Sequence, residues 1–142
     1  MRVCCKPIKG YNSFSAVFKA GQKLKTEQIF CSVVFNGNTE IDKIHTIYYG
    51  VSISKKIAKK AVVRNRVKRL LRESVRLLLK EFEARDLIFI NSIILIWQIA
   101  PKHSSEISLD CVLPAVKNIL EQASYLYKKK NKNKVLQNEV QL

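Results

Sequence analysis

The fold of this chain is decided by residues 54–80, SKKIAKKAVVRNRVKRLLRESVRLLLK. Apolar side chains recur here every three or four residues, and on a helical wheel they fall within one arc of roughly 140°. Basic side chains at intervals of four occupy the other side of the wheel. The pattern predicts an amphipathic helix from about Lys59 to about Asp86 that docks through its apolar stripe. The predicted stripe is Val63, Val67, Leu70, Leu71, Leu77 and Leu78, and the predicted basic side is Arg64, Lys68, Arg72, Arg76 and Lys80.

The same stretch concentrates the positive charge of the chain. Eleven lysine and arginine residues lie between Lys55 and Lys80, against one acid, Glu73, so this part carries +10 of the formal net charge of +15. A block of like charges repels itself unless a polyanion lies against it, and a pI of about 9.9 is typical of nucleic-acid binders. RNA or DNA phosphate is therefore the expected partner, and an anionic membrane surface is the rival that this charge leaves open.

The rest of the chain predicts a small mixed sheet. β-forming side chains fill residues 29–35 and 44–53. A further strand is expected at about residues 93–99, and residues 22–25 predict a short edge strand. The side chains expected on one face of the second strand are Ile47, Tyr49, Val51 and Ile53.

Two more helices are predicted near the two ends of the chain. The first carries Phe14 and Phe18 on one face and is expected to be capped by Asn12 or Ser13. The second places apolar side chains at core spacing across residues 112–123.

The order of these elements is helix, two or three strands, basic helix, strand, helix. This order predicts an α+β fold in which helices stack on one face of a small sheet. Residues 1–127 are expected to form a single domain, because a chain of 142 residues supports one modest core. Residues 128–142 are expected to form a lysine-rich, mobile tail.

Several classes of protein are disfavoured by what the sequence lacks. It contains no phosphate-binding glycine loop, no clustered carboxylates at metal-ligand spacing and no nucleophile–base pattern. The four cysteines have no zinc-site spacing and are expected to be free thiols in a reducing cytoplasm. The first residues carry no apolar signal segment, and the apolar run at residues 87–100 is too short and too polar to span a bilayer. The expectation is a cytoplasmic binder whose chemistry resides in a partner.

The triplet Arg64, Asn65 and Arg66, followed by Lys68 and Arg69, is more specific than bulk charge. Arginine presents a rigid fork of donors that matches phosphate oxygens. Asparagine lowers helix propensity, but its amide can donate and accept at once, as recognition of a base edge or a ribose hydroxyl requires. The alternative is a solvated basic face that carries a neutral asparagine.

Three ordered motifs resemble one known family. They are FSAVFKAG at residues 14–21, GVSISKK at residues 50–56 and AVVRNRVKRLLRE at residues 61–73. Together they are similar to the signature of the bacterial ribonuclease P protein subunit, and the likeness extends over about residues 8–127. The resemblance implies an α+β fold of the ribosomal protein S5 domain 2 type, with the order α-β-β-β-α-β-α. It also implies that the basic helix forms a left-handed crossover between parallel strands, against the usual right-handed rule.

The resemblance further implies a subunit of an endoribonuclease. In this family the protein assembles with a catalytic RNA, and the ribonucleoprotein cuts precursor tRNA to remove its 5′ leader. Mg²⁺ is expected to be held mainly by the RNA subunit and the substrate, with no catalytic or metal-binding side chain in the protein. No membrane and no further protein partner are expected.

The resemblance assigns residues to two surfaces. The positions expected at the leader of precursor tRNA are Phe14, Phe18, Lys55 and Lys56, an aromatic floor with lysines at its rim. The strand at residues 29–35 lacks the tyrosine expected beside them, but Tyr48 and Tyr49 lie on the next strand. The positions expected to contact the RNA subunit are Arg64, Asn65, Arg66, Lys68, Arg69 and Arg72.

Two other functions compete with this one. A stand-alone RNA- or DNA-binding regulator would place the basic helix in a groove, but the sequence shows neither a helix-turn-helix nor a dimerising element. A peripheral membrane protein would use the same amphipathic helix, but the chain supplies strands that can cover the apolar stripe.

Overall fold

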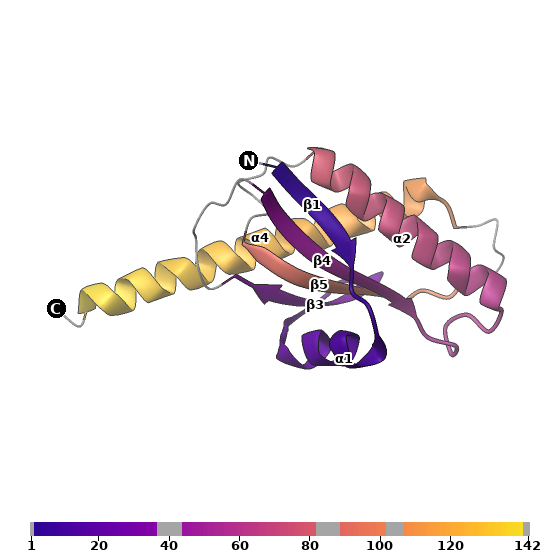
Figure 1. Ribbon diagram of the computed structural model, residues 1–142, viewed down its shortest axis with the longest axis horizontal. Helices are drawn as coiled ribbons and strands as arrows, with labels where there is room; N and C mark the ends of the chain where they lie inside the picture. The colour runs from indigo at the N-terminus through magenta and orange to yellow at the C-terminus, as the bar shows by residue number, and fades with distance from the viewer. Residues whose placement is uncertain (1, 37–43, 82–88, 102–106, 141–142) are drawn as a thin grey trace.

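The computed structural model describes residues 2–36, 44–81, 89–101 and 107–140. They form one five-stranded sheet with three helices packed around it (Figure 1). The elements are β1 (Arg2–Pro7), α1 (Tyr11–Ala20), β2 (Gln22–Lys25), β3 (Ile29–Phe35), β4 (Ile44–Ile53), α2 (Ala61–Glu81), β5 (Ile90–Trp97) and α4 (Leu109–Val140).

The sheet is mixed, with strand order β1-β4-β5-β3-β2. β1 pairs with β4 and β4 with β5 in parallel, whereas β3 is antiparallel to both β5 and β2. The basic helix α2 therefore joins two neighbouring parallel strands, and Ile53 at the end of β4 lies opposite Trp97 at the end of β5. The predicted α+β fold and the helical crossover between parallel strands are confirmed, while the left-handedness of that crossover stays a prediction.

The predicted element order was wrong at its start, because the chain opens with a strand. β1 holds the sequence RVCCKP and runs alongside β4, from Arg2 opposite Ile44 to Pro7 opposite Tyr49. Six residues without a clear apolar alternation give no local strand signal. The strand exists because β4 offers it a parallel partner, which is a tertiary effect that sequence periodicity does not report.

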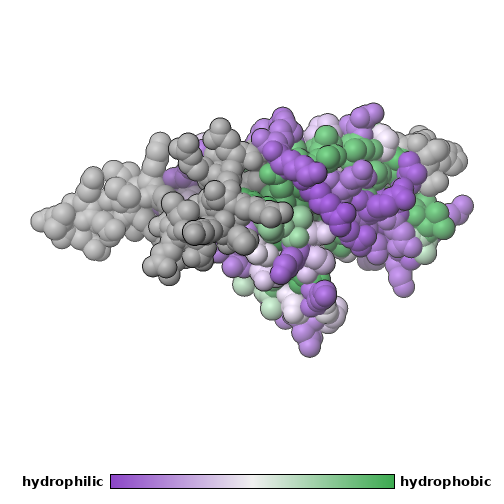
Figure 2. Space-filling model, turned by 45° about the horizontal axis from the view of Figure 1, so that its top comes forward, coloured by the Kyte–Doolittle hydropathy of each residue, from purple (hydrophilic) through white to green (hydrophobic). Residues whose placement is uncertain are grey.

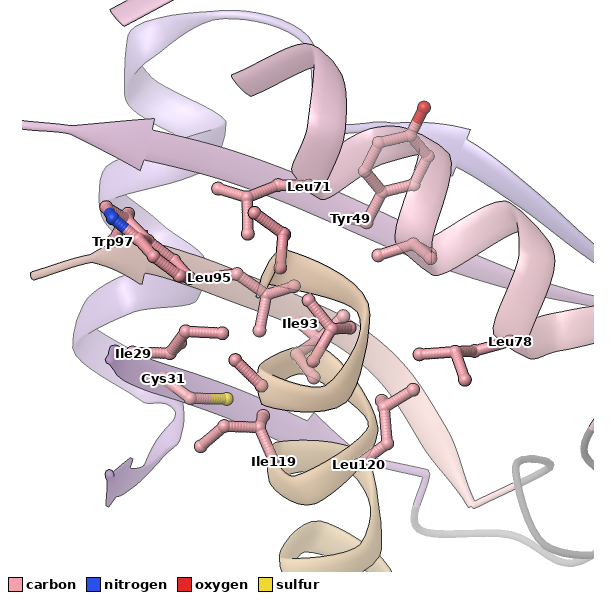
Figure 3. Close-up of a cluster of buried hydrophobic side chains, with 14 of the residues drawn as sticks. Ile29, Cys31, Tyr49, Leu71, Leu78, Ile93, Leu95, Trp97, Ile119 and Leu120 are labelled. Carbon is pink, nitrogen blue, oxygen red and sulfur yellow. The ribbon is translucent and has the colours of Figure 1, made fainter. Parts of the chain in front are cut away.

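The main core lies between the sheet and the two longer helices. Figure 3 shows side chains of β3, β4 and β5 meeting those of α2 and α4, with Leu71 and Leu78 from α2 and Ile119 and Leu120 from α4. The prediction that Ile47, Tyr49, Val51 and Ile53 share one face of β4 is confirmed. The structure shows that this is the core face, since Ile47, Tyr49 and Ile53 are buried and Val51 packs partly buried against the same core. In α2 the buried stripe is shifted slightly from the predicted one. Leu77 is 40% exposed, and the buried residues are Val67, Leu70, Leu71, Ser74, Val75 and Leu78.

Helix α1 lies on the opposite face of the sheet, so the prediction that the helices stack on one face was wrong for this helix (Figure 1). Its Phe14 ring lies against Gly50 of β4, and a Cβ atom on Gly50 would sit 3.0 Å from two ring carbons of Phe14. Ile94 of β5 contacts the same place, 3.4 Å from that Cβ position. Gly50 is therefore required because the helix approaches the strand too closely for a side chain.

The ends of the helices also differ from the prediction. Helix α1 begins after Gly10, which has φ 88° and makes no side-chain cap, so neither Asn12 nor Ser13 is the cap. Glycine adopts this positive φ at no steric cost. The predicted domain boundary after Tyr127 falls inside α4, whose backbone stays helical through Val140. The mobility of residues 128–142 stays a prediction, and the predicted end of the basic helix near Asp86 lies outside the described residues.

Candidate nucleic-acid interface

The approach to helix α2 is a turn organised by Ser54. The backbone N–H groups of Ile57 and Ala58 both donate to the Ser54 carbonyl oxygen at 3.1 Å, and the N–H of Ile57 also lies 3.3 Å from Ser54 Oγ. Ala58 is buried in the main core, which anchors the turn. Lys55 and Lys56 are exposed on it. The serine of the SKK motif thus shapes the turn, and the two lysines are presented to solvent.

Arg64 fastens this turn to the first part of α2. Its Nη1 donates to the carbonyl oxygen of Ala58 at 2.9 Å and to that of Lys59 at 2.7 Å. The guanidinium group carries further N–H donors that these two bonds leave available. Arg64 therefore holds the lysine-bearing turn in place and also adds positive charge to this end of the helix.

Arg66 fastens the other side of α2 to the start of α4. Its Nε donates to the carbonyl oxygen of Ile107 at 3.0 Å. A shallow depression lies beside it, lined by Val62, Asn65, Arg66 and Arg69. Val62 is 73% exposed at this edge, which is unusual for a valine. The depression combines an amide, two guanidinium groups and an apolar contact, a set that suits a nucleotide better than a bare phosphate.

Further along the helix, Arg69 and Arg72 are exposed. Neither makes a hydrogen bond or ion pair with any other residue that the structure describes. Lys68 is partly buried beside them. Hydrophilic side chains gather in a continuous band along α2 (Figure 2). We call the following set the α2 basic face: Arg64, Asn65, Arg66, Lys68, Arg69 and Arg72.

The aromatic residues of α1 lie on the other side of the sheet and contact it with part of each ring. The Phe18 ring centroid is 6.0 Å from that of Phe30 on β3, and the Lys23 ammonium lies 4.5 Å from the Phe18 centroid. Phe14 and Phe18 are both only partly buried. One part of each ring is therefore used in packing, and the remainder is available to a ligand. Packing against the sheet therefore leaves the leader-binding role expected for this pair as a prediction.

Lys23 and Ser32 hold the end of α1 and were missed by sequence reasoning. The Lys23 ammonium donates to the carbonyl oxygens of Phe18 and Gly21 and to Ser32 Oγ, and Ser32 Oγ donates to the Phe18 carbonyl at 3.0 Å. A positive charge at the C-terminus of a helix is favourable. A lysine three residues after the end of a helix is the only local signal, and the contact with Ser32 depends on strand pairing.

Tyr48 is the tyrosine presented on the α1 side of the sheet. It is two residues from Gly50 and so shares its face, and it is 42% exposed. Lys6 of β1 lies directly opposite Tyr48 in the parallel register. Tyr49 points into the main core and is 3% exposed. We call the partly exposed residues Phe14, Phe18 and Tyr48, with the turn residues Lys55 and Lys56, the α1-side surface.

The predicted residues therefore divide between two surfaces that the sheet separates. The α2 basic face lies on the side of α2 and α4, and Phe14 and Phe18 lie on the side of α1. The turn at residues 54–60 connects them, because it follows β4 and is held by Arg64.

Two thiols in the structure have raised pKa values. Burial raises the pKa of the Cys31 thiol to about 12. Burial also raises the pKa of the Cys5 thiol, although the charge of Arg76 opposes this shift. Thiols with raised pKa values are poor nucleophiles at neutral pH. Within the described ranges no three side chains of His, Cys, Asp or Glu come together as a metal site would require, and no helix is both long and apolar enough to cross a membrane.

Comparison with known proteins identifies one family. The family model described as Ribonuclease P matches residues 5–93. The ribonuclease P protein component of Clostridium kluyveri is 36% identical over 124 residues, which cover 85% of this chain and 96% of that protein. The component from Caldanaerobacter subterraneus is 44% identical over 79 residues, or 48% of this chain and 67% of the relative. The match with the component from Rippkaea orientalis, at 35% identity, covers 51% of this chain and 56% of the relative.

Solved structures agree with this result. The RNase P protein of Staphylococcus aureus superposes with a TM-score of 0.58 at 26% identity, covering 82% of this chain and 94% of that one. The RNase P protein of Thermotoga maritima superposes with a TM-score of 0.55 at 24% identity, covering 77% and 89% of the two chains, which supports the fold.

Proposed function

We propose that the α2 basic face binds the RNA subunit of ribonuclease P, because this chain belongs to the family of bacterial ribonuclease P protein components. As a member of that family it is a protein subunit of this tRNA-processing endoribonuclease. The observation that carries this proposal is the pair Arg69 and Arg72. Both guanidinium groups are exposed and have no partner among the described residues, while the opposite side of the same helix is buried in the core. Such a surface is stable beside a polyanion.

The geometry favours RNA over a stand-alone role in a DNA groove. α2 packs along its whole buried stripe against α4 and β4, so it is not a free recognition helix. The depression at Asn65 can accept an unpaired base or a ribose hydroxyl beside phosphates bound by Arg66 and Arg69. The family match and the packing of α2 favour the ribonuclease P subunit over the rival function, a stand-alone nucleic-acid-binding protein.

We further propose that the α1-side surface binds the 5′ leader of precursor tRNA. Its aromatic side chains are partly exposed and its lysines are exposed to solvent, which suits a single strand bound without strong sequence preference. Bases would stack on Phe14, Phe18 and Tyr48, and phosphates would lie near Lys55 and Lys56. The turn that carries these lysines is held by Arg64, a member of the α2 basic face. Binding of the RNA subunit would therefore help to position the lysines for the leader, and binding of the leader would help to position Arg64 for the RNA subunit.

In this proposal the cleavage chemistry belongs to the RNA subunit. Mg²⁺ would be held by RNA and substrate phosphates, because the described side chains do not converge on a metal site. The protein would act by neutralising phosphates and by holding the leader so that the scissile bond is positioned. We place the complex in the cytoplasm, where Cys4, Cys5, Cys31 and Cys111, all free thiols in the structure, would remain reduced, with the RNA subunit as the required partner.

Single-turnover cleavage of a precursor tRNA tests the proposal. The assay uses a bacterial ribonuclease P RNA at low Mg²⁺ concentration, with and without this protein. We expect protein-dependent release of the 5′ leader that disappears when the RNA subunit is omitted. Tight RNA binding without any stimulation of a cognate RNA subunit would instead indicate a stand-alone RNA-binding protein.

A further inference from the structure

A second basic surface lies on the last part of α4. Ala123 is the last buried residue among the α4 side chains that the structure describes, and the helical backbone continues to Val140 (Figure 1). Five lysines occupy the seven residues 128–134, with asparagine at the other two positions. Like charges three or four residues apart destabilise a helix that stands by itself in water.

The rotation of this part of α4 is fixed by Tyr127. Its ring stacks on Phe89 at a centroid distance of 4.7 Å and contacts Phe35 at 5.4 Å, so this face of the helix is held against the sheet. Tyr125 lies about 200° away around the helix from Tyr127. It is 70% exposed. The aromatic anchor therefore turns a second tyrosine outward.

Lys128 and Lys129 lie three and four residues after Tyr125 and share its face of the helix. Both are exposed, and neither forms an ion pair or hydrogen bond with the part of the chain that the structure describes. Glu121, also exposed, lies one turn before Tyr125 and marks where the basic surface ends. We call Tyr125, Lys128 and Lys129 the α4 basic surface. An exposed aromatic ring beside unpaired lysines is typical of binding to a single-stranded nucleic acid.

The α4 basic surface is separate from the α2 basic face. Lys117 of α4 pairs with Glu81, at the end of α2, with Nζ and Oε1 3.3 Å apart. Lys128 lies eleven positions after Lys117, which corresponds to about 16 Å of helix directed away from that pair. One phosphate group cannot reach both surfaces, but an extended RNA can.

We infer that the α4 basic surface is a second contact site for the RNA subunit and takes an unpaired segment of it. One base stacks on Tyr125, and the flanking phosphates bind Lys128 and Lys129. The inference rests on the proposed function, since it requires the RNA subunit to be the partner of this chain. Charge complementarity selects the RNA, because both lysines of this surface are exposed and the chain as a whole carries a net charge of +15.

Salt titration of the full-length protein with its cognate RNA subunit tests the inference. We expect Lys128→Gln with Lys129→Gln to lower the slope of log affinity against log salt by about 1.4, from about 0.7 for each phosphate contact on a single strand. Tyr125→Ala should weaken binding by about fivefold or more with little change in slope, and Tyr125→Phe should retain affinity because the ring remains. The matched control, Lys9→Gln with Lys25→Gln, removes the same charge from exposed positions elsewhere and should leave the slope unchanged.

The outcomes separate the inference from the proposed function. An unchanged slope for the Lys128 and Lys129 variant, with a lowered slope for Arg69→Gln and Arg72→Gln, overturns the inference and leaves the proposed function intact. If neither variant lowers the slope, both fail. An equal decrease in the control shows a general charge effect and overturns the inference. A decrease seen with precursor tRNA alone, but not with the RNA subunit alone, overturns the assignment to the RNA subunit. The Lys128 and Lys129 variant and its control test the inference even if Tyr125→Ala disturbs the fold.

Discussion

Replacement of Arg69 and Arg72 by glutamine isolates RNA binding from stability. Both side chains are exposed and without a partner in the described part of the chain, so their removal breaks no contact within it. Glutamine and arginine have similar helix propensities. We therefore expect the free energy of unfolding to change by no more than about 0.5 kcal/mol.

The effect on RNA binding follows from counterion release. Each arginine is expected to neutralise one phosphate, and each lost contact lowers the log–log salt slope by about 0.7 to 0.9. The double variant should therefore lower the slope by about 1.4 to 1.8, which corresponds to binding about 25- to 60-fold weaker at 0.1 M salt and almost unchanged near 1 M salt.

Filter binding of the cognate RNA subunit over a range of KCl concentrations measures this slope. The matched control is Arg76→Gln with Lys80→Gln, which removes two exposed charges from the same helix beyond the α2 basic face. The reasoning is refuted if the Arg69 and Arg72 variant keeps the wild-type slope. It is refuted equally if the control loses as much slope as the test variant.

Arg64 and Arg66 are poorer choices for this measurement. Arg64 donates to the carbonyl oxygens of Ala58 and Lys59, and Arg66 donates to that of Ile107. Their replacement by alanine is expected to weaken RNA binding, as the sequence predicts, but also to loosen the turn before α2 and the start of α4. A loss of affinity in these variants would not distinguish lost phosphate contacts from a loosened structure.

Three further outcomes are expected. Gly50→Ala should destabilise the protein by about 1–3 kcal/mol in urea unfolding, because its Cβ would press on the Phe14 ring at 3.0 Å; a neutral result would mean that α1 shifts freely. Phe14→Leu should weaken binding of leader-bearing precursor more than binding of mature tRNA in the holoenzyme, and an equal loss for both would assign the ring to packing alone. The pKa of the Cys31 thiol is about 12 in the folded state, against 9.0 for a free thiol, so between these pH values the thiol stays protonated in the folded state and loses its proton in the unfolded state. The stability present below pH 9 should therefore fall by up to about 1.4 kcal/mol per pH unit above it, and Cys31→Ala should remove this part of the pH dependence of urea unfolding.

Sequence patterns predicted the elements whose signals are local and repeated. The basic helix carries a 3.6-residue periodicity, and the face of β4 shared by Ile47, Tyr49, Val51 and Ile53 carries a 2-residue alternation. The strand at β3 is a continuous run of β-forming side chains. Leu77 was wrongly placed in the buried stripe, because neighbouring elements decide which side of a helix is covered. The cap of α1 was also predicted wrongly, because the path of the chain before the helix decides which residue can cap it.

The sequence by itself determined that the chain is basic, that its charge lies on one side of an amphipathic helix, and that its motifs resemble one family. These properties are fixed by the order of residue types and need no partner element. Only the tertiary structure decided that β1 joins the sheet, that α1 covers the opposite face, and that Tyr48 is exposed while Tyr49 is buried. It also decided which arginines are held by backbone carbonyls and which are free of described partners. The physical reason is that strand pairing, close helix approach and side-chain partners join residues far apart in the chain, and no local pattern encodes such contacts.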